Sequence, residues 1–75
     1  MTTTTRDLAS RAQAIQQRSD GMRKAAARCV AVVLSASPSV DVARDELEHI
    51  TTPDLRQASI DLLDELAAAD QAAAP

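Results

Sequence analysis

The feature of this sequence that most constrains its fold is a series of apolar or small residues spaced alternately four and three positions apart through its first half. Such spacing is typical of one helix face that packs lengthwise against a partner helix. One column of the series is mostly small, which lets two helix backbones approach to roughly 8 Å. The series, called the N-terminal seam below, consists of Leu8, Ala12, Ile15, Ser19, Met22, Ala26, Cys29 and Val33. It predicts close packing, either within the chain or against a second copy.

The N-terminal seam keeps its phase across Gly21, the only glycine of the chain. A helix that ends and restarts usually loses phase, so we expect one long helix over residues 5–35 that at most bends at this glycine. Glycine costs ~1 kcal/mol inside a helix relative to alanine. Replacing Gly21 by alanine is therefore expected to stabilise the protein by about 0.4–1 kcal/mol.

Two later signals divide the rest of the chain. Pro38 is flanked by serines, which is typical of a break between elements. Thr52 suits an N-cap, and Pro53 suits the first position of a helix. The sequence therefore predicts an all-α fold, a small three-helix domain with one long N-terminal helix and two shorter ones. Its expected organisation is a single domain (1–75) with a frayed start (1–4), helices over 5–35, 39–50 and 53–69, and a flexible tail (70–75).

The chain is short for a self-sufficient core. It has 75 residues and no aromatic side chain, and a domain of this size buries only about 60% of the surface of its unfolded chain. Small domains compensate with disulfides, metals or oligomerisation. Because Cys29 is the only cysteine, an internal disulfide is impossible. We therefore expect a homodimer, completed by helix packing along the N-terminal seam.

Charge is distributed unevenly along the chain, whose net charge is −3. Residues 1–37 carry six basic and two acidic side chains, whereas residues 38–75 carry two basic and nine acidic ones. The two halves should attract each other, within one protomer or across a dimer, although exposed pairs set register more than they supply stability. The predicted basic face consists of Arg11, Arg18, Arg23, Lys24 and Arg28, and the predicted acidic face of Asp54, Asp61, Asp64 and Glu65.

No pattern for catalysis or cofactor binding stands out in the sequence. His49 follows Glu46 by three positions, which on a helix is half of a carboxylate–histidine di-iron ligand set. The chain has no second motif of this kind, so Glu46 and His49 are weak metal candidates and no bound metal is expected. Cys29 lies on an apolar face without a neighbouring base, which indicates an inert thiol. We predict no catalytic residue and no cofactor.

The pattern favours a protein partner over other ligands. The segment 53–69, which would be the recognition helix of a helix-turn-helix, is acidic and would be repelled by phosphates. Nucleic-acid binding is therefore not expected, and no apolar run approaches the ~20 residues of a membrane span. We predict a small, non-enzymatic, cytoplasmic protein-interaction or regulatory module. The alternatives are a nucleic-acid-binding regulator that uses the basic face and a carboxylate–histidine metal protein.

Overall fold

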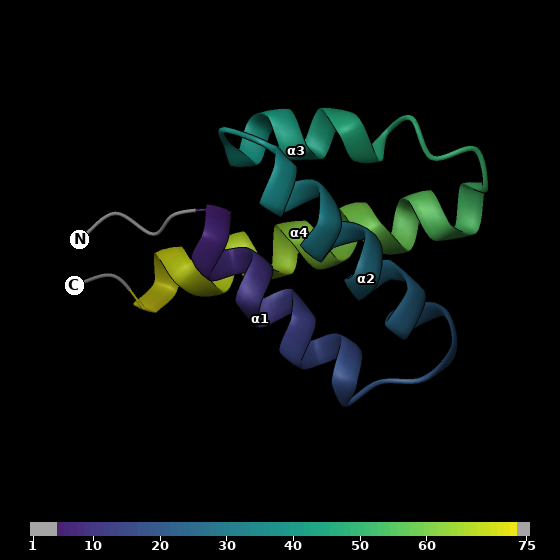
Figure 1. Cartoon of the computed structure of the whole chain (residues 1–75), viewed down its shortest axis with the longest axis horizontal. Helices are drawn as coiled ribbons and strands as arrows, with labels where there is room; N and C mark the ends of the chain where they lie inside the picture. Colours follow the sequence, from purple (N-terminus) through teal and green to yellow (C-terminus); the bar gives the residue numbers. More distant parts are fainter. Residues whose placement is uncertain (1–4, 74–75) are drawn as a thin grey trace.

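The structure is a computed structural model that describes residues 5–73, and these residues form four α-helices and no strand. The helices are α1 (Thr5–Gln17), α2 (Gly21–Ala36), α3 (Val40–Leu47) and α4 (Pro53–Ala73). Figure 1 shows α2 between α1 and α3, with α4 running behind α2. The predicted all-α fold is confirmed, but the helices of the described segment are four rather than three.

The expected long N-terminal helix is wrong, because the chain turns back at residues 18–20. Gly21 has a φ of +61°, a left-handed conformation that glycine adopts readily because it has no Cβ. The N–H groups of Arg18 and Ser19 donate to carbonyl oxygens three residues earlier, at 3.1 and 3.4 Å, and these bonds tighten the end of α1. As a result α1 and α2 pack against each other as a hairpin (Figure 1). The link is short enough to preserve the phase of the N-terminal seam, so periodicity could not reveal the turn.

The break at Pro38 is confirmed, and α3 follows it. The side-chain oxygen of Ser39 accepts the N–H of Val42 at 3.2 Å, which satisfies one of the unpaired N–H groups at the start of the helix. The helix ends at Leu47 rather than at residue 50. The three following residues form a tighter turn, in which each N–H donates to the carbonyl oxygen three positions earlier: Glu48, His49 and Ile50, at 3.1–3.2 Å.

The last helix, α4, begins at Pro53 and continues to Ala73, beyond the expected end at residue 69. Residues 70–73 of the predicted tail are therefore the last part of this helix. Alanine has the highest helix propensity, which explains why this alanine-rich segment prolongs the helix. The predicted frayed start, residues 1–4, and the last two residues of the predicted tail, 74–75, lie outside the described residues.

The core lies where α4 contacts α1, α2 and α3, and where α1 contacts α2. Small residues are frequent in it, and they allow the helices to approach closely without large side chains between them. Because α4 covers one side of α2, the opposite side of α2 is left without a covering helix. The buried apolar residues are Leu8, Ala9, Ala12, Ala26, Ala27, Val30, Ala31, Leu34, Ala43, Leu47, Leu62, Leu63 and Leu66.

Candidate functional site

The structure divides the N-terminal seam between the core and the surface. Leu8, Ala12 and Ala26 are at most 2% exposed, so they pack inside the protomer and offer no contact to a second copy. The remaining members are half-buried (Ile15, Ser19, Cys29 and Val33) or exposed (Met22, 47%). The predicted interface along this seam therefore does not exist as one continuous surface.

The reason is that a different side of α2 faces the neighbouring helices. The buried face of α2 consists of Ala26, Ala27, Val30, Ala31 and Leu34. Val30 and Leu34 are among the largest fully buried side chains, and neither belongs to the N-terminal seam. Since α2 packs against α1, α3 and α4, the best position for its largest residues is the side facing these neighbours. The seam residues beyond Ala26, Cys29 and Val33, consequently lie at the edge of this buried face, where they are only partly buried against the core.

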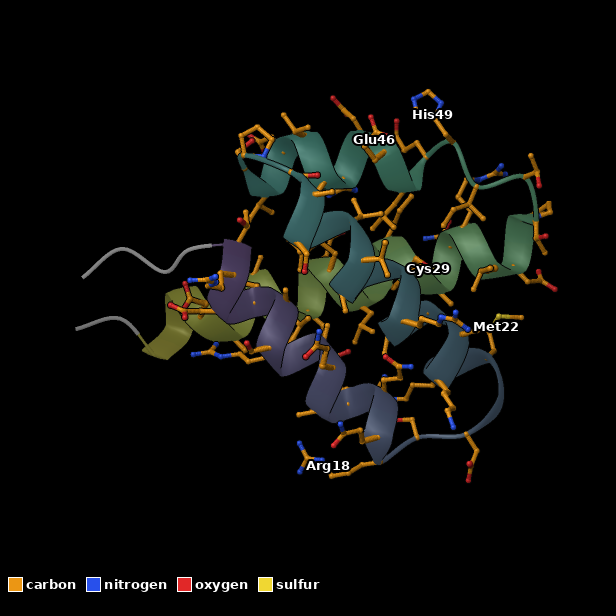
Figure 2. The ribbon with its side chains drawn as sticks, viewed as in Figure 1. Arg18, Met22, Cys29, Glu46 and His49 are labelled. Atoms are coloured by element: carbon orange, nitrogen blue, oxygen red, sulfur yellow. The ribbon has the colours of Figure 1, made fainter. Side chains whose placement is uncertain are left out.

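The outward side of α2 carries a second apolar series, called the α2 outer stripe below. Its members are spaced three and four positions apart along the whole helix: Met22, Ala25, Cys29, Val32 and Ala36. Val32 is 62% exposed and Met22 is 47% exposed, while Cys29 is half-buried. Figure 2 shows Met22 near the first turn of α2 and Cys29 at its middle. This spacing is the one with which a partner helix packs on a helix surface.

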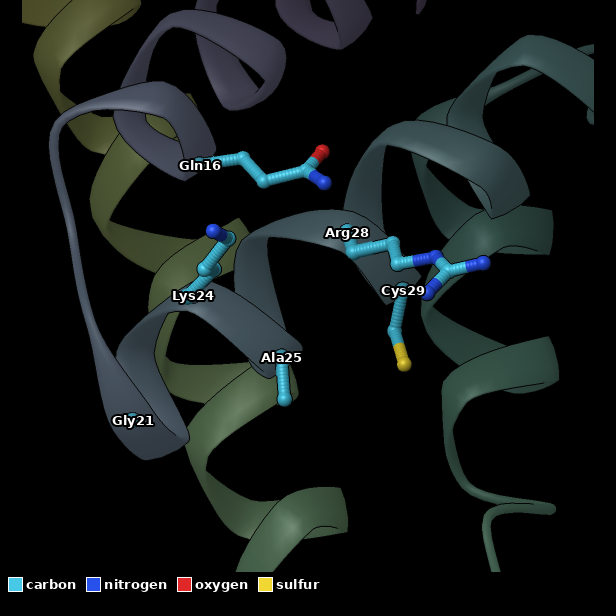
Figure 3. A pocket seen from close by; sticks show the side chains of 6 residues that line it. All are labelled: Gln16, Gly21, Lys24, Ala25, Arg28 and Cys29. Atoms are coloured by element: carbon cyan, nitrogen blue, oxygen red, sulfur yellow. The ribbon is translucent and has the colours of Figure 1, made fainter.

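Two shallow hollows lie along the α2 outer stripe, one at each half. The first, of about 470 Å³, extends from the last turn of α1 to the N-terminal half of α2 and is lined by Gln16, Gly21, Lys24, Ala25, Arg28 and Cys29 (Figure 3). The second, of about 350 Å³, lies between the C-terminal half of α2 and α3 and is lined by Val32, Val33, Ala36, Ser37, Val42 and Glu46. Together they make a mostly apolar surface with cations at one end and a carboxylate at the other.

The predicted basic face is only partly free. Arg11 pairs with Asp70 at 3.7 Å, and Arg23 pairs with Glu65 at 3.8 Å; both pairs connect the N-terminal hairpin to α4. The Nε of Arg18 donates to the backbone oxygen of Ala14 at 3.3 Å. Lys24 and Arg28, one helical turn apart beside the first hollow, have no hydrogen-bond or ion-pair partner within residues 5–73. The structure therefore leaves these two cations available beside the α2 outer stripe.

The predicted acidic face lies on exposed positions of α4, and three of its four members interact with neighbours. Asp64 pairs with Arg44 of α3 at 2.6 Å, Asp61 accepts a hydrogen bond from Gln57 at 2.8 Å, and Glu65 pairs with Arg23. Asp54 lies in the first turn of α4, where the helix dipole favours a negative charge. The expected attraction between the two halves of the chain thus operates within one protomer.

The metal candidates do not form a ligand set. Glu46 is in α3, but His49 lies beyond the end of that helix, so the two residues do not share a helix face as a di-iron motif requires. Figure 2 shows both side chains on the outer side of the molecule. Within residues 5–73, no cluster of three or more His, Cys, Asp or Glu side chains could hold a metal ion.

Sequence reasoning missed Ala25, Val32 and Ala36 as surface residues. A signal for them exists, because their spacing with Met22 and Cys29 is as regular as that of the N-terminal seam. The N-terminal seam and the α2 outer stripe are both regular apolar series on α2. Periodicity alone therefore does not show which side of the helix is buried.

None of the described helices is both long and apolar enough for a transmembrane segment. Comparison of the chain with protein-family models, curated proteins and solved structures found no match.

Proposed function

We propose that this protein is a non-enzymatic protein-interaction module, which binds a helix of a protein partner along the α2 outer stripe. The observation that carries this proposal is the stripe itself. Single exposed apolar residues are common on protein surfaces, but a series of five with helix-packing spacing on one face, four of them exposed, is what a partner helix requires. The two hollows extend the stripe onto α1 and α3, so the partner would lie over three helices.

Charge supports a protein partner over nucleic acid. Two of the five residues of the predicted basic face are engaged with α4, through Arg11 and Arg23. The free cations Lys24 and Arg28 stand beside apolar side chains rather than in a continuous basic surface. Cations at the rim of an apolar contact select partners by charge and speed their association. We therefore place the nucleic-acid alternative second.

The proposal is tested with a pair of matched variants in affinity capture from a native lysate. Ala25→Glu puts a carboxylate inside the α2 outer stripe, and Ala68→Glu makes the same change on an exposed position of α4. Both variants should keep the helical circular-dichroism spectrum of the wild type. Quantitative mass spectrometry should find proteins retained by the wild type and by Ala68→Glu but lost with Ala25→Glu. Identical capture by all three proteins would contradict the assignment of the surface.

A further inference from the structure

We propose that the occupant of the α2 outer stripe is a second copy of this chain, whose α2 runs antiparallel across the first. This inference rests on the proposed function, because it names the partner of the same surface. It places the two-fold axis of the dimer at the middle of the stripe, beside Cys29. The interface of the homodimer expected from the sequence is thereby placed on the outward side of α2 and not along the N-terminal seam, three of whose members are buried in the protomer.

Shape supports a self-complementary contact. The α2 outer stripe has Cys29 at its centre, with Met22 and Ala36 at equal distances along the chain on either side. In an antiparallel pair, Met22 of each copy therefore lies toward the end of the stripe that carries the smaller Ala36 in the other copy. Met22 is unbranched and flexible, and such a side chain fills irregular gaps well. The hollow beside Val32, Ala36 and Val42 offers such a gap on the partner subunit.

Charge selects the same arrangement. Lys24 and Arg28 flank the N-terminal half of the stripe on the side of α1, whereas Glu46 flanks its C-terminal half on the side of α3. When two helices cross at about 50°, the commonest packing class, an antiparallel copy carries each basic group diagonally toward the carboxylate of the other copy. The dimer interface would then contain this contact between basic group and carboxylate twice, as two-fold symmetry requires.

The area that a stable dimer requires sets how far the contact extends beyond α2. Figure 1 views the molecule down its shortest axis, and α2 crosses in front of α4 on this broad face. The molecule extends 36 and 25 Å in the two directions of that face. A stable interface buries about 800 Å² on each partner, so the contact has to extend from α2 onto α1 and α3 across much of this face.

Sedimentation equilibrium tests the second copy directly. The wild type and Ala68→Glu should be dimers at micromolar concentration. Val32→Glu, at a position already 62% exposed, should fold normally and dissociate at least about tenfold more readily, since a buried unpaired carboxylate opposes association. Arg28→Glu should also weaken the dimer, and the double variant Arg28→Glu with Glu46→Arg should recover affinity. A wild type that is monomeric at micromolar concentration would overturn the proposal.

Chemical cross-linking tests the arrangement. A short bismaleimide, which adds one thiol at each end without an oxidant, should join two wild-type chains through Cys29 near the two-fold axis. In a Cys29→Ala background, a thiol introduced by Met22→Cys should cross-link no more than one introduced by Ala68→Cys on α4, because antiparallel packing separates the two copies of position 22. Efficient cross-linking through Met22→Cys would mean parallel helices and would overturn the arrangement.

The two proposals fail in different ways. A monomeric wild type, together with captured proteins that are lost with Ala25→Glu, would overturn the second copy and leave the interaction function standing with another partner. A monomeric wild type without any such stripe-dependent capture would overturn both proposals.

Discussion

At the scale of single residues, two small residues affect the free energy of unfolding more than their size suggests. Ser59 is fully buried among apolar residues, and its hydroxyl has no hydrogen-bond partner within the described residues. Gly21 holds a left-handed conformation at the turn between α1 and α2. Neither residue carries a charge, and both depend on the surrounding fold for their effect on stability.

We expect Ser59→Ala to raise the free energy of unfolding by about 1 kcal/mol. An unpaired buried hydroxyl costs roughly 1–3 kcal/mol of desolvation, and alanine is also a better helix former than serine. Urea denaturation of the two proteins at equal protomer concentration measures the difference. A clear loss of stability in the variant would show that the hydroxyl has a partner and would contradict this prediction.

Gly21→Ala is expected to destabilise the protein by about 1–2 kcal/mol, because the left-handed region is unfavourable for residues with a Cβ. This sign is opposite to the one expected for a continuous helix. A Cβ added at Gly21 meets no atom within 4 Å, so the cost comes from the backbone and not from a clash. Gly21→Asn is the control, since asparagine tolerates the conformation better, and its denaturation midpoint should lie between those of the glycine and alanine proteins. An alanine variant with a higher midpoint than the wild type would contradict the turn.

At the scale of elements, short-range signals set most helix boundaries. Pro38 and Ser39 separate α2 from α3, and Pro53 begins α4. The shortest helix, α3, has eight residues, which is too few for a helix to be stable in isolation. Its N-cap and its contacts with α2 and α4 therefore matter more than its propensity.

Ser39→Ala is predicted to lower the free energy of unfolding by about 1 kcal/mol, the usual effect of removing an N-cap. The variant loses the acceptor for the Val42 N–H, now 3.2 Å from the serine oxygen. Ser39→Asp keeps a cap and should remain close to the wild type. Thermal unfolding followed by circular dichroism at fixed concentration compares the three proteins, and equal melting temperatures for all of them would refute the importance of this cap.

At the scale of the whole molecule, α4 is the element to which each of the other three helices is linked by an ion pair. Arg11, Arg23 and Arg44 each reach an acidic residue of α4, from α1, α2 and α3 in turn. All three arginine side chains are about half exposed, so each pair contributes less than about 1 kcal/mol. The first two pairs neutralise part of the basic face, and Lys24 and Arg28 remain beside the α2 outer stripe.

We therefore predict weak, salt-sensitive binding to duplex DNA at most. The net charge is −3, and two of the five residues of the basic face pair with α4, which lowers the number of cations that could displace counterions from phosphates. Fluorescence anisotropy with labelled random-sequence and genomic duplexes at physiological salt should show no saturable binding at micromolar protein. Tight, sequence-selective binding would favour the nucleic-acid alternative, and reversal of the charge at Lys24 and Arg28 would then locate the contact.

The sequence by itself determined the helical character of the chain, the break at Pro38 and the start at Pro53, because propensity, proline and capping act over a few residues. The uneven charge distribution also predicted the attraction between the basic half and the acidic half of the chain. Only the tertiary structure decided that the chain turns at Gly21, since the short link keeps the phase of the N-terminal seam. Only the tertiary structure decided which side of α2 is buried, because that helix carries two regular apolar series. The packing of Val30 and Leu34 against the neighbouring helices buries a side that, apart from Ala26, belongs to neither series, and it leaves Val32 on the surface.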